Sequence, residues 1–108
     1  MAASITPIEL ERGLTSATPP RLLDVREPEE HAFAALRGSK LIPLASLIAR
    51  SQEIAAWKED EVVVYCHHGI RSLHAIALLQ RLGFTSLWNL SGGIDAWSLE
   101  VDRNVPRY

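Results

Sequence analysis

The feature that most constrains the fold is the apolar run at residues 62–65. It reads Val-Val-Val-Tyr, so three β-branched residues and one aromatic residue follow one another without the polar alternation of a half-exposed strand. A strand of this composition is typically covered on both faces, as a central strand of a parallel sheet is. The run therefore favours an α/β protein in which helices cover both faces of a parallel sheet.

The other expected elements alternate between helix and strand. Thr6 is followed by a proline and by Glu9, which is the pattern of a capping box with proline at the first helical position. A Pro-Glu-Glu sequence marks another helix start, since carboxylates complement the partial positive charge there. Helices are expected at residues 7–13, 28–33, 44–50 with an extension to 57, 72–82 and 94–99, and strands at residues 21–25, 62–65 and 86–90. Gly92 and Gly93 are expected to form a tight turn that needs positive φ.

Length and composition limit the class of protein. The chain has 108 residues, and residues 1–108 are expected to form one domain. Its 47% hydrophobic and 22% charged residues are typical of a globular chain rather than a disordered one. A formal net charge of -2, without a Lys/Arg cluster, argues against a nucleic-acid binder. Residues 1–4 do not begin a signal peptide and the longest apolar run is far too short to span a membrane, so we expect a soluble cytoplasmic protein.

Cys66 directly follows the central apolar run and is the only cysteine of the chain, so no intramolecular disulfide can form. A short loop with Gly69 leads from it to a serine that opens a helix. In such a strand-loop-helix turn, backbone N–H groups can converge to form an anion-binding concavity at the helix N-terminus. The partial positive charge of these N–H groups favours the thiolate of Cys66 over the thiol, and the thiolate is the nucleophile.

Three further side chains of the loop could add positive charge. Arg71 carries a fixed charge and a fork of donors that can hold an oxyanion. His67 and His68 could contribute charge when protonated, although solvent-facing positions at the rim of the loop are an equally good interpretation of both.

The loop sequence Cys-His-His-Gly-Ile-Arg-Ser at residues 66–72 resembles the active loop of rhodanese-like sulfurtransferases. The similarity extends over nearly the whole chain. Residues 22–30 resemble the family's first strand and acidic helix, residues 42–44 the segment after its second short strand, and residues 92–97, Gly-Gly-Ile-Asp-Ala-Trp, its C-terminal signature. One stretch departs from the pattern: where members often carry Gly-His-Ile-Pro-Gly-Ala, residues 34–39 read Ala-Ala-Leu-Arg-Gly-Ser.

The resemblance implies a single rhodanese domain, with a parallel sheet of about five strands and helices on both faces. It also implies a thiosulfate:cyanide sulfurtransferase, in which a persulfide on Cys66 carries sulfane sulfur from thiosulfate or a persulfide donor to a thiol or cyanide acceptor. The amides of residues 67–71 would stabilise the persulfide, and the donor-binding residues would be Arg71, His67, His68, Gly69 and Ile70. Neither a cofactor nor a metal is implied.

The partners that follow are a small-molecule or protein sulfur donor and a thiol acceptor. No nucleic acid and no membrane is expected as a partner. The chain is expected to be a monomer or a weak homodimer.

Other interpretations use the same residues. Cys66 alone could be a small buried hydrophobe. Together with His67, His68 and His74 it could suggest zinc, although adjacent ligands in a tight turn strain tetrahedral geometry. A cysteine phosphatase or arsenate reductase also has a Cys-to-Arg anion loop, but one residue longer than the four residues between Cys66 and Arg71. A noncatalytic rhodanese-like module would commonly lack the cysteine, whereas a sulfur-relay role stays open.

Charged residues outside the loop are interpreted structurally. Asp24 and Arg26 follow a strand expected to be parallel to that of Cys66, so they could border the site. The favoured interpretation is that they are buried and satisfy backbone groups of their loop. Glu27, Glu29 and Glu30 are interpreted as a solvated helix start, and His74 as a helix-surface residue.

Overall fold

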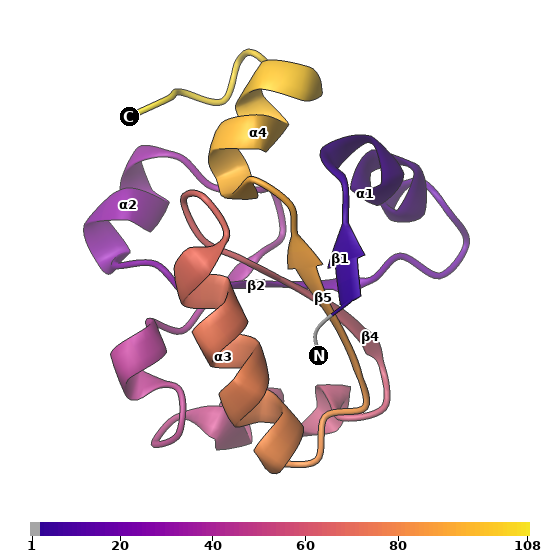
Figure 1. Ribbon diagram of the computed structural model, residues 1–108, viewed down its shortest axis with the longest axis vertical. Helices are drawn as coiled ribbons and strands as arrows, with labels where there is room; N and C mark the ends of the chain where they lie inside the picture. Colours follow the sequence, from indigo (N-terminus) through magenta and orange to yellow (C-terminus); the bar gives the residue numbers. More distant parts are fainter. Residues whose placement is uncertain (1–2) are drawn as a thin grey trace.

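The computed structural model describes residues 3–108, so Met1 and Ala2, which belong to the stretch expected not to begin a signal peptide, lie outside the described residues. Five strands form one sheet (Figure 1): β1 (Ala3–Ile5), β2 (Arg21–Asp24), β3 (Lys40–Leu41), β4 (Glu61–Tyr65) and β5 (Ser86–Leu90). Their order across the sheet is β1-β5-β4-β2-β3, and every neighbouring pair is parallel. The expected parallel sheet is confirmed, with the valine-rich strand at its centre.

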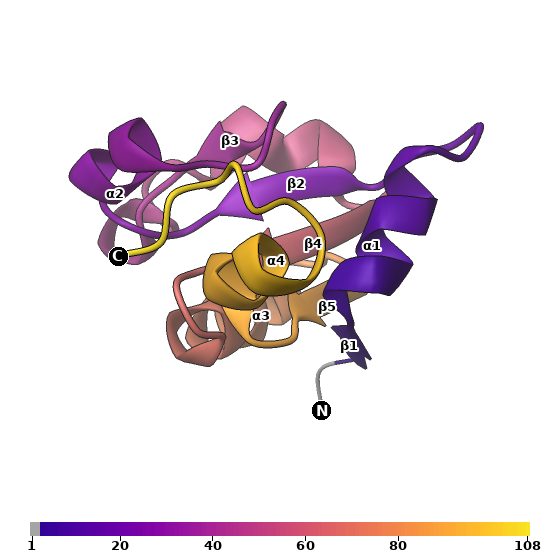
Figure 2. The ribbon, with the colours of Figure 1, turned by 90° about the horizontal axis from the view of Figure 1, so that it is seen from above.

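Four helices surround this sheet: α1 (Pro7–Leu14), α2 (Pro28–Phe33), α3 (Ile70–Arg81) and α4 (Gly93–Glu100). Buried residues of α3 belong to one core and those of α1 and α4 to the other, so these helices cover opposite faces of the sheet. Figure 2 shows the helices and the sheet from above. Side chains of β4 alternate between the two layers. Val62 and Val64 pack in the α3 layer, whereas Val63 and Tyr65 pack in the layer of α1 and α4, and all four are fully buried. Burial of both faces explains why this strand shows no polar alternation.

The expected helix starts of α1 and α2 are confirmed. The hydroxyl of Thr6 accepts a hydrogen bond from the Glu9 amide at 3.1 Å, and the Glu9 carboxylate accepts one from the Thr6 amide at 2.9 Å. At α2 the Glu27 amide donates to the Glu30 carboxylate at 2.9 Å. Each capping interaction satisfies a backbone donor that the first helical turn leaves free.

The segment from residue 44 to residue 57 is not the helix expected from the sequence. It forms two 3₁₀ segments, Leu44–Ser46 and Ser51–Trp57, and Ile54 has a non-helical backbone (φ -121°, ψ 16°). Leu47 and Ile54 are fully buried, and Leu44 and Trp57 pack beside them. The contacts at 44 and 47, and at 54 and 57, are three residues apart, which suits a 3₁₀ turn better than a continuous α-helix.

One additional strand and one helix boundary also differ from the expectation. The sequence does not predict β1, because three residues carry too little pattern; this strand is defined by its parallel pairing with β5 (Ala3 with Trp88). α3 begins at Ile70 rather than at Ser72, because Gly69 caps the helix with φ +106°. Arg71 therefore belongs to the first turn of α3. Within the described residues, no helix is long and apolar enough to cross a membrane.

Candidate active site

Cys66 lies directly after β4, at the carboxyl end of the central strand, where open α/β sheets commonly place their sites. In Figure 1 the loop from β4 to α3 passes close to the beginning of α4. The residue is 1% exposed. Two backbone amides point at its Sγ atom, that of Gly69 at 3.1 Å and that of Ser72 at 3.4 Å. Of the amides expected around the thiol, those of residues 67–71, only that of Gly69 donates to the sulfur, and the second donor, Ser72, lies one residue beyond that range.

Two buried polar residues, Ser72 of α3 and Asn89 of β5, hold the amides around the sulfur in place. The hydroxyl oxygen of Ser72 lies 3.3 Å from Cys66 Sγ and donates its proton to Asn89 Oδ1 at 2.5 Å. The amide nitrogen of Asn89 in turn donates to the carbonyl of Gly69 at 3.2 Å. Asn89 thus ties Gly69 and Ser72, at the α3 end of the loop, to the neighbouring strand. Sequence reasoning missed this residue, although an asparagine inside the apolar strand sequence Ser-Leu-Trp-Asn-Leu was a visible signal.

The start of α4 orients the peptide groups of the loop. The amide of Ile94 donates to the carbonyl of Cys66 at 2.9 Å, and that of Asp95 donates to the carbonyl of His67 at 3.2 Å. Gly92 and Gly93 make this approach possible with φ values of +74° and +64°, which confirms the expected turn. A Cβ atom on Gly93 would collide with the carbonyl groups of Cys66 and His67. The carbonyls of the loop are therefore held on the α4 side.

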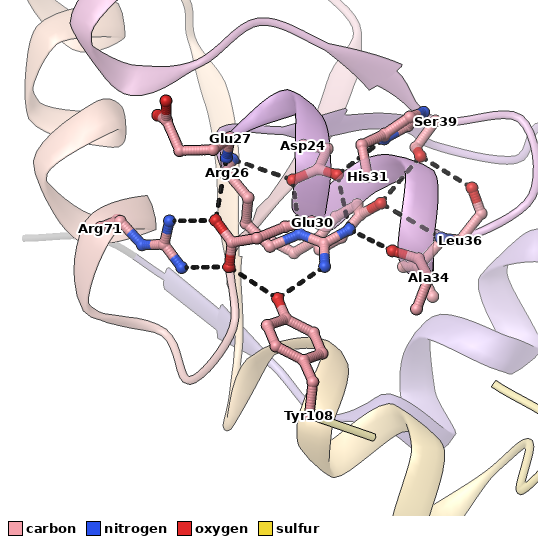
Figure 3. Close-up of polar contacts among 11 residues, drawn as sticks. Asp24, Arg26, Glu27, Glu30, His31, Ala34, Leu36, Ser39, Arg71 and Tyr108 are labelled. Atoms are coloured by element: carbon pink, nitrogen blue, oxygen red, sulfur yellow. Dashed lines mark hydrogen bonds and ion pairs between the residues drawn. The ribbon is translucent and has the colours of Figure 1, made fainter. Parts of the chain in front are cut away.

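Arg71 forms a two-pronged ion pair with Glu30 of α2, shown in Figure 3. Its Nη1 and Nη2 atoms donate to the two oxygens of Glu30 at 2.7 and 2.9 Å. The hydrogen bonds from Arg71 lower the pKa of Glu30 to about 2. The interpretation of Glu30 as part of a solvated helix start is wrong, because its side chain is only 19% exposed and bridges two elements. The pair links α2 to the first turn of α3.

Asp24 and Arg26 form a buried ion pair, and both side chains are fully enclosed. Arg26 binds both carboxylate oxygens of Asp24 at 2.7 and 2.9 Å and donates to the carbonyl of Ala34 at 2.6 Å. The Arg26 amide also donates to Asp24 Oδ1 at 3.0 Å, which confirms the interpretation that the pair is buried and satisfies a backbone group of its own loop. The remaining nitrogen of Arg26 donates to the hydroxyl of Tyr108 at 2.7 Å, which connects the pair to Glu30 (Figure 3).

The two histidines of the loop have different surroundings. The ring of His67 is stacked on that of Tyr108, with centroids 3.8 Å apart and planes 5° from parallel. Burial, followed by the charge of neighbouring His68, lowers the pKa of His67, so this ring is less readily protonated than a free histidine. His68 has 62% of its side chain exposed and its Nδ1 atom lies 4.0 Å from Asp95. Of the two expected rim residues, only His68 faces solvent.

The remaining expected residues lie on the outer side of the loop. Ile70 is 67% exposed, and His74 lies on the exposed surface of α3 as expected. The structure therefore brings Cys66, Gly69 and the α3 start together, and it turns Arg71 towards Glu30. Among residues 3–108, no group of three or more His, Cys, Asp or Glu side chains is arranged to hold a metal ion.

Comparison with known proteins places this arrangement in a family. The family described as "Rhodanese-like domain" matches residues 6–100. The chain is 36% identical over 98% of its length to the probable adenylyltransferase/sulfurtransferase MoeZ of Mycobacterium tuberculosis, of which it covers 27%. It is 34% identical over 91% of its length to a protein of Allochromatium vinosum named sulfurtransferase, of which it covers 90%.

Solved structures of rhodanese-like proteins have the same fold as this chain. The human single-domain sulfurtransferase TSTD1 superposes with a TM-score of 0.79 at 30% identity, covering 93% of this chain and 98% of that one. The chain spans only 27–30% of the length of the first curated relatives it matches.

Proposed function

This chain belongs to the rhodanese-like domain family, and we propose on that premise that it is a sulfurtransferase with Cys66 as its nucleophile. The observation that carries the proposal is the pair of amides, from Gly69 and Ser72, that point at the cysteine sulfur at the start of a helix. Amide dipoles in this position stabilise a negative charge on sulfur, whether it belongs to a thiolate or to a persulfide. We propose residues 1–108 as the one domain that performs this reaction.

In the proposed first step, the Cys66 thiolate attacks the outer sulfur of the donor. With thiosulfate, the sulfur-sulfur bond of the donor breaks, sulfite leaves with the bonding electron pair, and a persulfide anion forms on Cys66. In the second step, a thiolate or cyanide attacks the outer sulfur, so a new persulfide or thiocyanate leaves and the Cys66 thiolate returns. No net oxidation takes place in either step.

The donor would meet the outer side of the loop. We assign donor contact to Arg71, Gly69, His67, His68 and Ile70, whose backbone or side chains form the rim around Cys66. The exposure of His68 and Ile70 supports contact with a donor or acceptor that is itself a protein. The single cysteine has to remain reduced in order to act, which is consistent with a cytoplasmic location.

An oxyanion phosphatase is the less favoured alternative. Its loop would need one more residue than the four that separate Cys66 from Arg71. A sulfur-relay role is compatible with the proposal, since it changes only the donor that delivers sulfur to Cys66.

The test is intact mass spectrometry of the protein after incubation with thiosulfate or with a thiol persulfide. We expect the wild-type chain to gain the mass of one sulfur atom and to lose it when a thiol or cyanide is added. The Cys66→Ala variant should gain no sulfur and should keep a native circular dichroism spectrum. A wild-type chain that takes up sulfur from neither donor, or a Cys66→Ala variant that still transfers sulfur, would contradict the proposal.

A further inference from the structure

Glu30 brings a fixed negative charge to the loop that holds Cys66. Its Oε1 atom accepts hydrogen bonds from Arg71 Nη1 at 2.7 Å and from the Glu27 amide at 2.9 Å. Its Oε2 atom accepts from Arg71 Nη2 at 2.9 Å and from the Tyr108 hydroxyl at 2.8 Å. A carboxylate offers about four such acceptor positions, so those of Glu30 are all occupied. The carboxylate is thereby held in one orientation, as Figure 3 shows.

This charge persists at every pH at which the protein would work. The pKa of Glu30 lies at about 2, chiefly because Arg71 donates to the carboxylate. The side chains of Glu30 and Arg71 are 19% and 36% exposed, so the pair is only partly screened by water. An incoming anion therefore meets an arginine whose charge is already balanced by a neighbouring carboxylate. Its attraction to Arg71 is offset by repulsion from Glu30, and the repulsion is largest for a dianion.

We propose that Glu30 is a specificity-determining residue, which disfavours doubly charged oxyanion donors and leaves the Cys66 site to donors of low charge, the persulfides of thiols. This inference rests on the sulfurtransferase function proposed above and narrows its donor class. In the favoured step the Cys66 thiolate bonds to the outer sulfur of the donor persulfide. The sulfur-sulfur bond of the donor breaks, and the donor leaves as a thiolate with the bonding electron pair, so atoms and charge balance.

The first experiment measures charge selection at Cys66 without any sulfur transfer. Iodoacetate and iodoacetamide have nearly the same shape, but only the first is an anion, and Cys66 is the only thiol they can alkylate. The ratio of the two alkylation rates cancels any change in the fraction of thiolate. We expect Glu30→Gln to raise the iodoacetate-to-iodoacetamide ratio about threefold or more, as the loss of one nearby charge would.

Glu30→Gln removes the charge and keeps one of the two acceptor oxygens of the side chain. Glutamine can still accept from the Glu27 amide, so the capping interaction of α2 is retained. Glu29→Gln is the matched control, because it removes the same charge from an exposed position in the same helical turn. The ratio in the control should stay at the wild-type value. An unchanged ratio in Glu30→Gln, or an equal rise in Glu29→Gln, would overturn the proposal.

The second experiment compares sulfur transfer from thiosulfate, a dianion, and from the persulfide of 2-mercaptoethanol, which carries at most one negative charge. Glu30→Gln should raise kcat/KM for thiosulfate roughly tenfold, since a dianion responds more strongly than a donor of lower charge, and should change the persulfide value less than about threefold. Glu30→Asp, which keeps the charge but shortens the side chain, should not gain thiosulfate activity. If both variants lose transfer from both donors equally, Glu30 only clamps α2 to the loop and the proposal is wrong. A wild-type chain inactive with either donor contradicts the sulfurtransferase function instead, and the alkylation ratio still decides the role of Glu30.

Discussion

The surroundings of the Cys66 sulfur are positioned by residues that do not contact a substrate in the proposed mechanism. Ser72 contacts the sulfur with its hydroxyl, and this hydroxyl needs Asn89 to accept its proton. Asn89 accepts with its side-chain oxygen, and this oxygen faces Ser72 because the amide nitrogen donates to the carbonyl of Gly69. The orientation of all three groups is therefore determined by one backbone carbonyl. A buried network of this kind stabilises the site only while every member keeps its partner.

The Ser72→Ala variant tests this dependence. Removal of the hydroxyl leaves the oxygen of Asn89 buried without its donor, so we expect the free energy of unfolding to fall by about 1–3 kcal/mol in chemical denaturation. Ser98→Ala is the matched control, since Ser98 is also buried but donates only to the carbonyl of Ile94 within α4. The control should lose less than about 0.5 kcal/mol, because a helical carbonyl keeps its backbone partner. Equal losses in both variants would argue against the network.

At the scale of elements, the loop of Cys66 is clamped between α4 and α2. The clamp at α4 depends on the close approach of Gly93 to the carbonyls of Cys66 and His67. The clamp at α2 depends on the ion pair of Glu30 with Arg71. Neither helix carries a substrate-binding group in the proposed mechanism, but both determine where the loop lies.

Gly93→Ala should be far more disruptive than an ordinary glycine substitution. The added Cβ would overlap backbone atoms of residues 66 and 67, so α4 or the loop would have to shift. We expect a loss of roughly 3 kcal/mol or more in the free energy of unfolding, and a loss of sulfur uptake by Cys66. Gly38→Ala is the control: Gly38 has φ +80°, but a Cβ atom there would meet no other atom within 4 Å, so only a backbone strain of about 1 kcal/mol applies. Similar melting temperatures for the two variants would contradict the steric argument.

The ion pair at α2 predicts a pH dependence of stability. The pKa of Glu30 is about 2 in the folded chain, below its ordinary value of 4.5. The unfolded chain therefore takes up this proton first as the pH falls, and the stabilisation, present above pH 4.5, is lost between about pH 4.5 and 2. We expect this loss to be of the order of 2 kcal/mol, after allowance for the partial exposure of the pair.

Denaturation curves at several pH values would measure the effect. Glu30→Gln should flatten the dependence in this window, because glutamine does not titrate. Glu53→Gln is a useful comparison: the pKa of Glu53 is also about 2, owing to Arg50 and Lys40, but its side chain is much more exposed. The Glu53→Gln substitution should flatten the pH dependence of the free energy of unfolding less than Glu30→Gln does. A larger effect from Glu53 than from Glu30 would show that the α2 ion pair is not the main source of acid sensitivity.

At the scale of the whole molecule, the sheet separates two cores. One core contains Leu23, Val64 and Leu79, and the other contains Leu10, Val63 and Ile94. The strand order places β4 in the interior of the sheet, between β5 and β2, so its side chains reach both cores. Cys66 continues the alternation of Val62 and Val64 and points into the α3 layer.

Because β4 is buried on both faces, we expect neighbouring valines of this strand to contribute equally to the free energy of unfolding. Val63 and Val64 are both fully buried but face opposite layers. We expect Val63→Ala and Val64→Ala each to lower the free energy of unfolding by about 2 kcal/mol, measured by urea denaturation. Leu99→Ala, at a residue that is 47% exposed, should cost much less. A marked asymmetry between the two valines would indicate that one layer packs loosely.

Much of the fold could be predicted from local sequence. A run of β-branched residues predicted the central strand, and the Thr-Pro-x-Glu and Pro-Glu-Glu patterns predicted the starts of α1 and α2. Cys66, Gly69 and the helix that follows were identified as one unit because their chemistry depends on residues adjacent in sequence. The pair Gly92 and Gly93 predicted its turn for the same reason, since tolerance of positive φ is a property of the residue itself.

Most of the features that the sequence did not predict depend on residues far apart in the chain. Glu30 lies 41 residues before its partner Arg71, and Asn89 lies 17 residues after Ser72. The short strand β1 exists only because β5 pairs with it, and residues 44–57 adopt 3₁₀ turns because the core accepts side chains at that spacing. The sequence by itself determined most of the helices and the central strands, and it provides a single cysteine as the candidate nucleophile. Only the tertiary structure decided which charges surround that thiol, because ion pairs and buried hydrogen bonds depend on distances that folding sets between separate elements.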